Sequence, residues 1–74
     1  MNDKQIEELY DSFMQCVNKV EKAETDKARA KWLKAAKEDY EEISDNRPKF
    51  SSAQLRRIKR AMSYLEALEA EDDA

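Results

Sequence analysis

The chain has 74 residues, enough for one small domain around a single core. Of these residues 42% are charged, the formal net charge is −3, and Gly and His are absent. Without Gly, phosphate-cradling and dinucleotide-binding loops lack their usual residue. With no His and with Cys16 as the sole cysteine, structural zinc sites, Cys/His dyads and intrachain disulfides are excluded. We therefore predict no catalytic residues, no metal and no cofactor, and we expect a protein that is not an enzyme.

The first residues lack the basic flank and apolar stretch of a secretory signal. Elsewhere the apolar residues occur in runs too short to span a membrane. A single unpaired cysteine is also typical of a reducing compartment. These features lead us to expect a cytoplasmic protein with no membrane partner.

A first helix is predicted over residues 3–23. Asn2 and Gln5 have the spacing of a capping box, in which each side chain bonds the backbone N–H of the other residue. The apolar residues that follow recur at three- and four-residue intervals and form one stripe: Ile6, Leu9, Tyr10, Phe13, Val17 and Val20. Cys16 lies at the margin of this stripe, and we interpret it as a small packing residue rather than a reactive thiol.

A second helix is predicted over residues 26–43. Its apolar stripe, which contains Trp32, Ala36, Tyr40 and Ile43, is out of phase with that of the first helix. One straight helix cannot bury both stripes on the same side, so we predict a break with Thr25 as the new N-cap. Because Trp32 shares this stripe, we interpret it as a core residue rather than as an exposed anchor.

A third helix follows the loop over residues 44–49, which contains the only proline, Pro48. Ser51 and Gln54 have the spacing of a capping box, and Phe50 is placed to pack on Leu55 as a hydrophobic staple. The apolar stripe continues through Leu55, Ile58, Met62, Leu65 and Leu68. We expect this helix to end at residues 67–70 and the acidic residues beyond it to fray.

The predicted fold is an all-α three-helix bundle, with one domain over residues 1–70 and an acidic tail over 71–74. The alternative is a hairpin of the first two helices that dimerises through its apolar stripe. Ten of the hydrophobic residues are Ala, which leaves about 20 larger apolar side chains for the core. A core this thin also predicts weak self-association or dependence on a partner.

Charge is strongly segregated along the chain. Residues 1–24 sum to −3, residues 25–46 to −1, residues 47–60 to +6 and residues 61–74 to −5. In an up, down, up bundle, the acidic start of the first helix and the acidic end of the second share one pole with the basic segment. The acidic tail then meets the lysines of the second helix at the other pole. This pattern predicts electrostatic matching within the fold.

The basic segment is also the best candidate for a binding site. Tyr64 lies on the side of the third helix away from Leu55 and Ile58, near the arginines, and it is either an exposed contact residue or a partly buried edge residue. The candidate partner-binding residues are Arg47, Lys49, Arg56, Arg57, Lys59, Arg60 and Tyr64. Six of them are cations and form the basic block, which consists of Arg47, Lys49, Arg56, Arg57, Lys59 and Arg60.

The sequence allows three interpretations of the basic block. It is solvated or paired within the fold, it docks an acidic protein, or it binds phosphate groups of a nucleic acid. Against nucleic acid, the connection before the third helix is longer than the turn of a helix-turn-helix, and the chain is acidic overall. We expect a small non-enzymatic helical protein that regulates, inhibits or adapts a partner protein. A nucleic-acid-binding regulator is the alternative.

Overall fold

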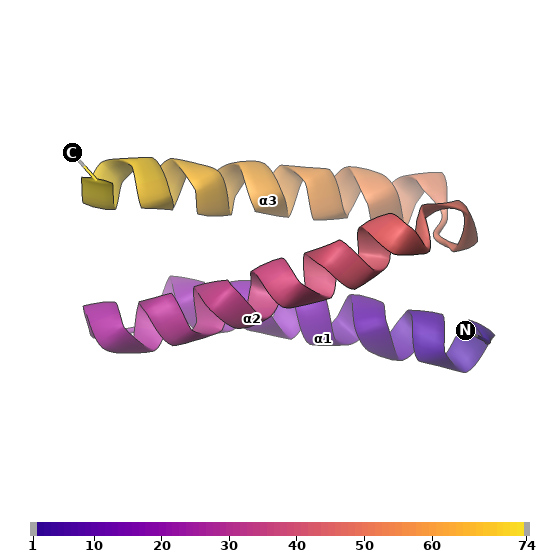
Figure 1. The fold of residues 1–74 in the computed structure, drawn as a ribbon, viewed down its shortest axis with the longest axis horizontal. Helices are drawn as coiled ribbons and strands as arrows, with labels where there is room; N and C mark the ends of the chain where they lie inside the picture. Colours follow the sequence, from indigo (N-terminus) through magenta and orange to yellow (C-terminus); the bar gives the residue numbers. More distant parts are fainter. Residues whose placement is uncertain (1, 74) are drawn as a thin grey trace.

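The computed structural model describes residues 2–73, which form three α-helices and one short 3₁₀ turn. The elements are α1 (Asp3–Lys22), α2 (Asp26–Asp45), η1 (Arg47–Lys49) and α3 (Ser52–Asp73). The three helices run alternately up, down and up, and residues 2–73 contain no strand (Figure 1). The prediction of an all-α three-helix bundle is therefore confirmed. The chain is not a simple helical hairpin.

The start of α1 has the predicted capping box. The Asn2 side chain accepts a hydrogen bond from the backbone N–H of Gln5 at 2.9 Å, and the Gln5 side chain accepts one from the backbone N–H of Asn2 at 3.0 Å. These bonds satisfy two of the donors that a helix N-terminus leaves open. The helix ends at Lys22 and the chain becomes extended at Ala23, one residue earlier than predicted.

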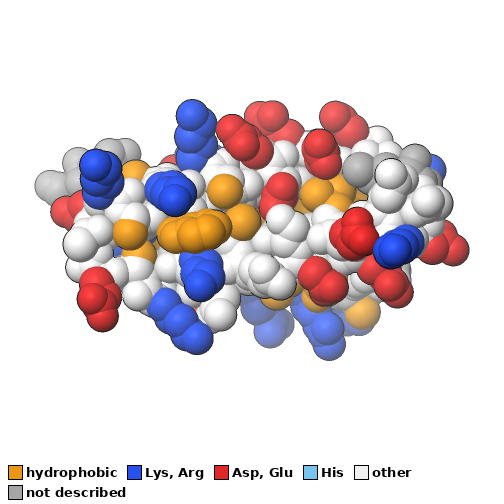
Figure 2. All heavy atoms as spheres, turned by 90° about the horizontal axis from the view of Figure 1, so that it is seen from below, with side chains coloured by type: hydrophobic (Ala, Val, Ile, Leu, Met, Phe, Trp, Pro, Cys, Tyr) orange, Lys and Arg blue, Asp and Glu red, His pale blue; other side chains and the backbone are white. Residues whose placement is uncertain are grey.

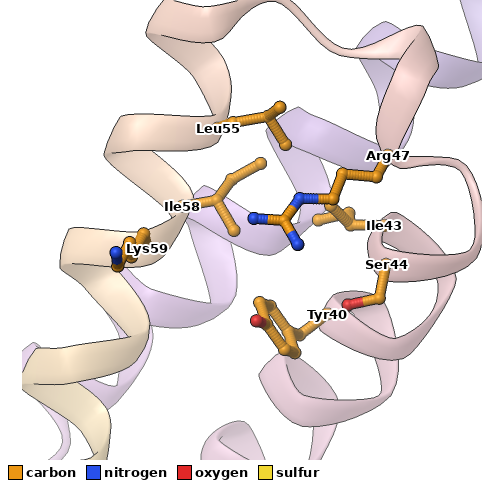
Figure 3. Close-up of a pocket in the computed structure, with 7 residues that line it drawn as sticks. All are labelled: Tyr40, Ile43, Ser44, Arg47, Leu55, Ile58 and Lys59. Carbon is orange, nitrogen blue, oxygen red and sulfur yellow. The ribbon is translucent and has the colours of Figure 1, made fainter.

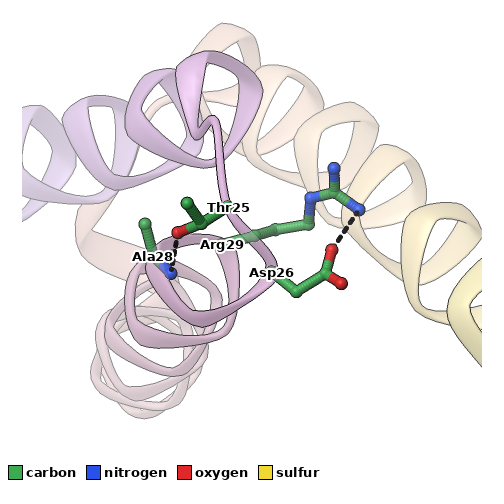
Figure 4. Close-up of polar contacts among 4 residues, drawn as sticks. All are labelled: Thr25, Asp26, Ala28 and Arg29. Atoms are coloured by element: carbon green, nitrogen blue, oxygen red, sulfur yellow. Dashed lines mark hydrogen bonds and ion pairs between the residues drawn. The ribbon is translucent and has the colours of Figure 1, made fainter.

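Thr25 separates α1 from α2, as the shift of the apolar stripe predicts. Its side chain accepts a hydrogen bond from the backbone N–H of Ala28 at 3.1 Å, and Asp26 faces Arg29 at 4.0 Å one turn into the helix (Figure 4). At its other end α2 continues to Asp45, two residues past the predicted boundary. Residues 44 and 45 extend the helix because the residue that disfavours helical backbone comes later, at Pro48.

The connection to α3 is a turn rather than an open loop. Pro48 lies inside η1, where its fixed φ angle suits the first turn of a helix. Ser51 then caps α3 as predicted: its hydroxyl oxygen accepts the Gln54 N–H at 3.1 Å, and the Gln54 side chain accepts the Ser51 N–H at 2.9 Å. Phe50, the predicted staple residue, is buried.

The end of α3 differs from the prediction. The helix continues to Asp73, past the expected end at residues 67–70 and through most of the segment that we expected to fray. Ala70 and Glu71 are good helix formers, and no Gly or Pro follows them, so nothing local stops the backbone hydrogen bonds. Acidic charge near a helix C-terminus costs only a few tenths of a kcal/mol, which is too little to end the helix earlier.

The core lies between all three helices, and most of its buried residues come from α1 and from the region of α3. α1 buries Ile6, Leu9, Phe13, Cys16 and Val20; α2 buries Ala36 and Ile43; the region of α3 buries Phe50, Ile58, Ala61, Met62 and Leu65. Phe13 and Leu65 have no exposed surface. Within the described residues α1 packs more closely on α2 than on α3. No helix in residues 2–73 is long and apolar enough to cross a membrane.

Trp32 is less buried than predicted. It packs against the core but remains partly exposed, and the ammonium groups of Lys19 and Lys31 lie 6.0 and 5.3 Å from its ring centroid. A bundle of three short helices is too narrow to enclose an indole on every side. The two lysines cover part of what the core leaves open, and cation–π attraction adds to their packing.

Candidate functional site

The fold brings acidic and basic segments together at the same pole. The start of α1, the end of α2 and the start of α3 lie at one end of the bundle, as predicted (Figure 1). On the face opposite α3, basic side chains gather where α1 leads into α2, and acidic side chains predominate towards the other end (Figure 2). The exposed acidic residues of this pole include Glu7, Glu8, Asp11, Glu41, Glu42 and Asp45.

The predicted electrostatic matching is present at the far pole. Lys37 of α2 forms an ion pair with Glu69 of α3, which joins the lysine-rich half of α2 to the acidic end of the chain. At the pole of the basic block, five of the six basic residues have no such ion pair within the described residues. Within the described residues, the ion pairs and side-chain hydrogen bonds include no contact with Arg47, Arg56, Arg57, Lys59 or Arg60. Lys49 is the exception, because it has an interaction partner of its own.

A cleft opens between the C-terminal half of α2 and the N-terminal half of α3. Its volume is about 120 Å³, and seven residues line it: Tyr40, Ile43, Ser44, Arg47, Leu55, Ile58 and Lys59. Figure 3 shows the Arg47 side chain reaching from η1 across the cleft, with its guanidinium between Ile58 and Tyr40. The cleft therefore combines a floor of aliphatic side chains with two cations and two hydroxyl groups.

A second, shallower depression lies on the outside of α3. It is lined by Ala53, Arg56, Arg57 and Arg60; Ala53 lies three and four residues before Arg56 and Arg57, and Arg60 lies four and three residues after them, so all four lie on one side of the helix. The small Ala53 leaves space between the longer side chains. Three guanidinium groups on one face repel one another, and this repulsion favours the binding of an anion between them.

Tyr64 is exposed, which favours a contact residue over a partly buried edge residue. With 39% of its surface accessible, it is the large hydrophobic residue that stands out among the exposed side chains of the described part of the chain. It follows Arg60 by one helical turn and Arg57 by two, but it lines neither the cleft nor the depression.

The predicted site residues therefore fall into separate groups. Arg47 and Lys59 meet at the cleft, whereas Arg56, Arg57 and Arg60 surround the depression. Sequence reasoning missed Tyr40, Ser44 and Leu55 as site residues. Tyr40 and Leu55 were assigned to the core because they lie on apolar stripes, and Ser44 was assigned to a loop. The periodicity of a sequence does not show that the apolar stripes of two helices, here α2 and α3, leave a gap between them.

Cys16 lies in a small polar cluster between α1 and α2, away from the basic block. The Asp39 carboxylate accepts a hydrogen bond from the Ser12 hydroxyl at 2.8 Å and a longer one from the Cys16 thiol at 3.8 Å. Burial, together with the negative charge and hydrogen bond of Asp39, raises the pKa of the Cys16 thiol. The thiol therefore stays protonated at neutral pH. The interpretation of Cys16 as a packing residue agrees with its burial.

The described residues contain no cluster of three or more side chains suited to holding a metal ion. Comparison of the chain with protein-family models, with curated proteins and with solved structures found no match. The chemistry of the cleft and of the basic α3 surface is therefore the basis for a functional proposal.

Proposed function

We propose that this protein is a small helical interaction protein that docks an acidic partner protein through the basic block and Tyr64. Such docking would let it regulate, inhibit or adapt the partner by covering part of its surface. The observation that supports this proposal is the lack of internal ion pairs for five of the six basic-block residues, within the described part of the chain.

The charge pattern favours a partner over an internal role. Clustered cations that are not neutralised repel one another and gain from an external anion. The acidic side chains of the same pole belong to α1 and α2, so they do not neutralise the outer face of α3 through direct ion pairs. Helix solubility alone needs charges of mixed sign. Residues 47–60 contain six cations and no acid.

An acidic protein fits this surface better than a nucleic acid. A long nucleic acid docked on α3 would extend past the basic block, and its many phosphates would be repelled by the net charge of −3 of the chain. The cleft floor consists of Ile43, Leu55 and Ile58, with Tyr40 as the one aromatic residue of the lining, and aliphatic side chains are poorer stacking partners for bases than aromatic ones. A folded or short acidic partner avoids the repulsion that a long nucleic acid meets, and it can place an apolar side chain on the cleft floor.

A charge-reversal variant tests the proposal. The variant carries Arg56→Glu, Arg57→Glu and Arg60→Glu. The probes are a short peptide of Asp and Glu residues, a mixed-sequence DNA duplex and a mixed-sequence RNA, each titrated into ¹⁵N-labelled protein at two salt concentrations. We expect the peptide to shift the α3 resonances of the natural protein, and the variant to lose this response while keeping its melting temperature.

The control variant reverses three exposed lysines of the opposite pole, with Lys22→Glu, Lys27→Glu and Lys34→Glu. It has the same net charge as the first variant, so retained peptide binding would show that position matters rather than total charge. Nucleic-acid binding with a steep salt dependence and no peptide binding would overturn the proposal in favour of the alternative. A large, salt-sensitive loss of stability in the α3 variant would instead assign the block to pairing within the fold.

A further inference from the structure

We infer that the cleft between α2 and α3 takes one apolar side chain of the acidic partner, while Arg47 and Lys59 bind carboxylates on either side of it. This inference rests on the proposed function and deepens it. It replaces a general attraction between charges with a recognition pattern, namely one apolar anchor residue flanked by acidic residues.

The dimensions of the cleft suit a single side chain. Its volume is about 120 Å³, and an engineered protein cavity of about 150 Å³ holds one benzene molecule. A leucine, isoleucine or methionine side chain is therefore of the right size. The cleft is open to solvent along the gap between two helices, so a side chain projecting from a partner backbone can enter it.

The lining of the cleft selects for an amphipathic occupant. Ile43 and Ile58 are almost fully buried at its base, and Leu55 is partly exposed beside them. The exposed part of Leu55 gains from contact with another apolar group rather than with water, and the two buried isoleucines form the base beneath it. Arg47 and Lys59 come from opposite sides of the opening, one from η1 and one from α3 (Figure 3). A purely apolar occupant would bury these charges without compensation.

The basic surface continues beyond the cleft and fixes how a partner crosses α3. At about 100° per residue, Lys59 lies at the edge of α3 nearest α2, Arg56 and Arg60 lie on the outer face, and Arg57 lies on the far flank. A segment anchored in the cleft therefore meets Arg56 and Arg60 next as it crosses the helix. Because this surface is positively charged throughout, the residues that follow the anchor are acidic.

The interior of the bundle explains why the cleft stays open. The core residues of α3 that lie towards α1 are buried, but α2 and α3 make few close approaches to each other. η1 inserts an extra turn between α2 and α3, and its apolar content is one proline. The connection supplies no apolar side chain to fill the gap: Phe50 is already buried in the core, and Arg47 reaches across the gap with a charged group that the partner's carboxylate can bind.

The test compares two peptides that differ at one position. Both are short chains of Asp and Glu, and the central residue is Leu in one and Ser in the other. We expect the Leu peptide to bind about tenfold more tightly, because one leucine side chain leaves water. In a methyl-labelled sample, the Leu peptide should shift Ile58 and Leu55, whereas the Ser peptide should shift only the backbone signals of the arginines.

A filling variant provides the second arm. Ser44 lies exposed at the rim of the cleft, and Ser44→Trp places an indole over the opening without altering the basic block. We expect this variant to bind the Leu peptide only as tightly as the Ser peptide. Gln15→Trp is the matched control, because Gln15 is an exposed, neutral residue of α1 that does not line the cleft, and it should change neither affinity.

The outcomes separate the inference from the proposed function. Equal affinities of the natural protein for the two peptides would overturn the cleft inference and leave acidic docking intact. Failure of both peptides to bind would overturn both. If Ser44→Trp fails to fold, the comparison of the two peptides on the natural protein still decides the question, together with the methyl shifts.

Discussion

The two junctions between successive helices are built differently. α1 passes into α2 through Ala23, Glu24 and Thr25, with Thr25 capping the new helix, and the two helices then pack together closely (Figure 4). α2 passes into α3 through η1, and the helices leave a cleft lined by Tyr40 and Leu55 (Figure 3). At the α1–α2 junction, which we call closed, the apolar residues pack together and stabilise the fold. At the α2–α3 junction, which we call open, apolar surface and charge remain available for binding.

The side chains across the two junctions reinforce this contrast. Between α1 and α2, Phe13 lies 6.5 Å from Tyr40 between ring centroids, and Asp39 accepts a hydrogen bond from Ser12. Between α2 and α3, within the described residues, Lys37 forms an ion pair with Glu69, and both side chains are partly exposed. An exposed ion pair adds little stability, so α3 depends mainly on its contacts with the core.

The largest expected effect is at the closed junction. Phe13 is fully buried, so Phe13→Ala should cost about 3–5 kcal/mol, which is most of the stability of a small domain. Leu55→Ala at the open junction should cost clearly less, because Leu55 is partly exposed. Chemical denaturation of both variants measures the difference. Equal losses would show that the cleft is as tightly packed as the core.

The next largest effect on stability is expected at the N-cap of α3, the helix that follows the open junction. Ser51→Ala removes the cap hydroxyl of α3 and should cost about 0.5–2 kcal/mol. Ser52→Ala is the control: Ser52 is exposed and is not the cap, so it should change stability by less than about 0.5 kcal/mol. Denaturant midpoints decide between the two positions. A smaller loss for Ser51→Ala than for Ser52→Ala would contradict the cap.

The polar cluster of the closed junction predicts a pH dependence. The pKa of Cys16 is raised in the folded protein, so the protonated thiol stabilises the fold at neutral pH. This contribution is complete below the ordinary thiol pKa and is lost as the pH rises through the folded-state value. We expect Cys16→Ala to remove this component of the alkaline loss of stability, as measured by denaturation at several pH values.

Asp39→Asn sharpens the same prediction. The amide can still accept the Ser12 hydrogen bond, but it removes the negative charge beside the thiol. The pKa of Cys16 should therefore fall, although burial keeps it above the ordinary value. Alkylation by iodoacetamide, followed against pH, reports this shift directly. An unchanged pH profile would mean that Asp39 does not act on the thiol.

The smallest expected effect is at the α2–α3 ion pair. Lys37→Gln removes the partner of Glu69 and should cost at most about 1 kcal/mol, since both side chains are partly exposed. The loss should shrink when salt is added, because salt screens exposed charges. Melting curves at low and high salt measure it. A loss that does not depend on salt would point to packing by the lysine stem instead.

The starts of the three helices were predictable from the sequence because their signals are local. Asn2 with Gln5, Thr25, and Ser51 with Gln54 each act within one turn of backbone, and the structure places all three as caps. The position of Tyr64 on the helix indicated that it lies away from the core stripe, but only the structure decided that it is exposed. The helix ends were less accurate. α3 reaches Asp73 because a helix continues until a residue stops it, and no such residue is present.

The sequence by itself determined the helices, their caps, the segregation of charge and the alternating order of the bundle, because each depends on neighbours along the chain. Only the tertiary structure decided that Trp32 is half buried and that the stripes of α2 and α3 stop short of each other around Tyr40 and Leu55. The same holds for the five basic residues without ion pairs in the described part of the chain. Periodicity gives the direction in which a side chain points, but not the distance to the surface that it faces. That distance depends on how three helices share one small core.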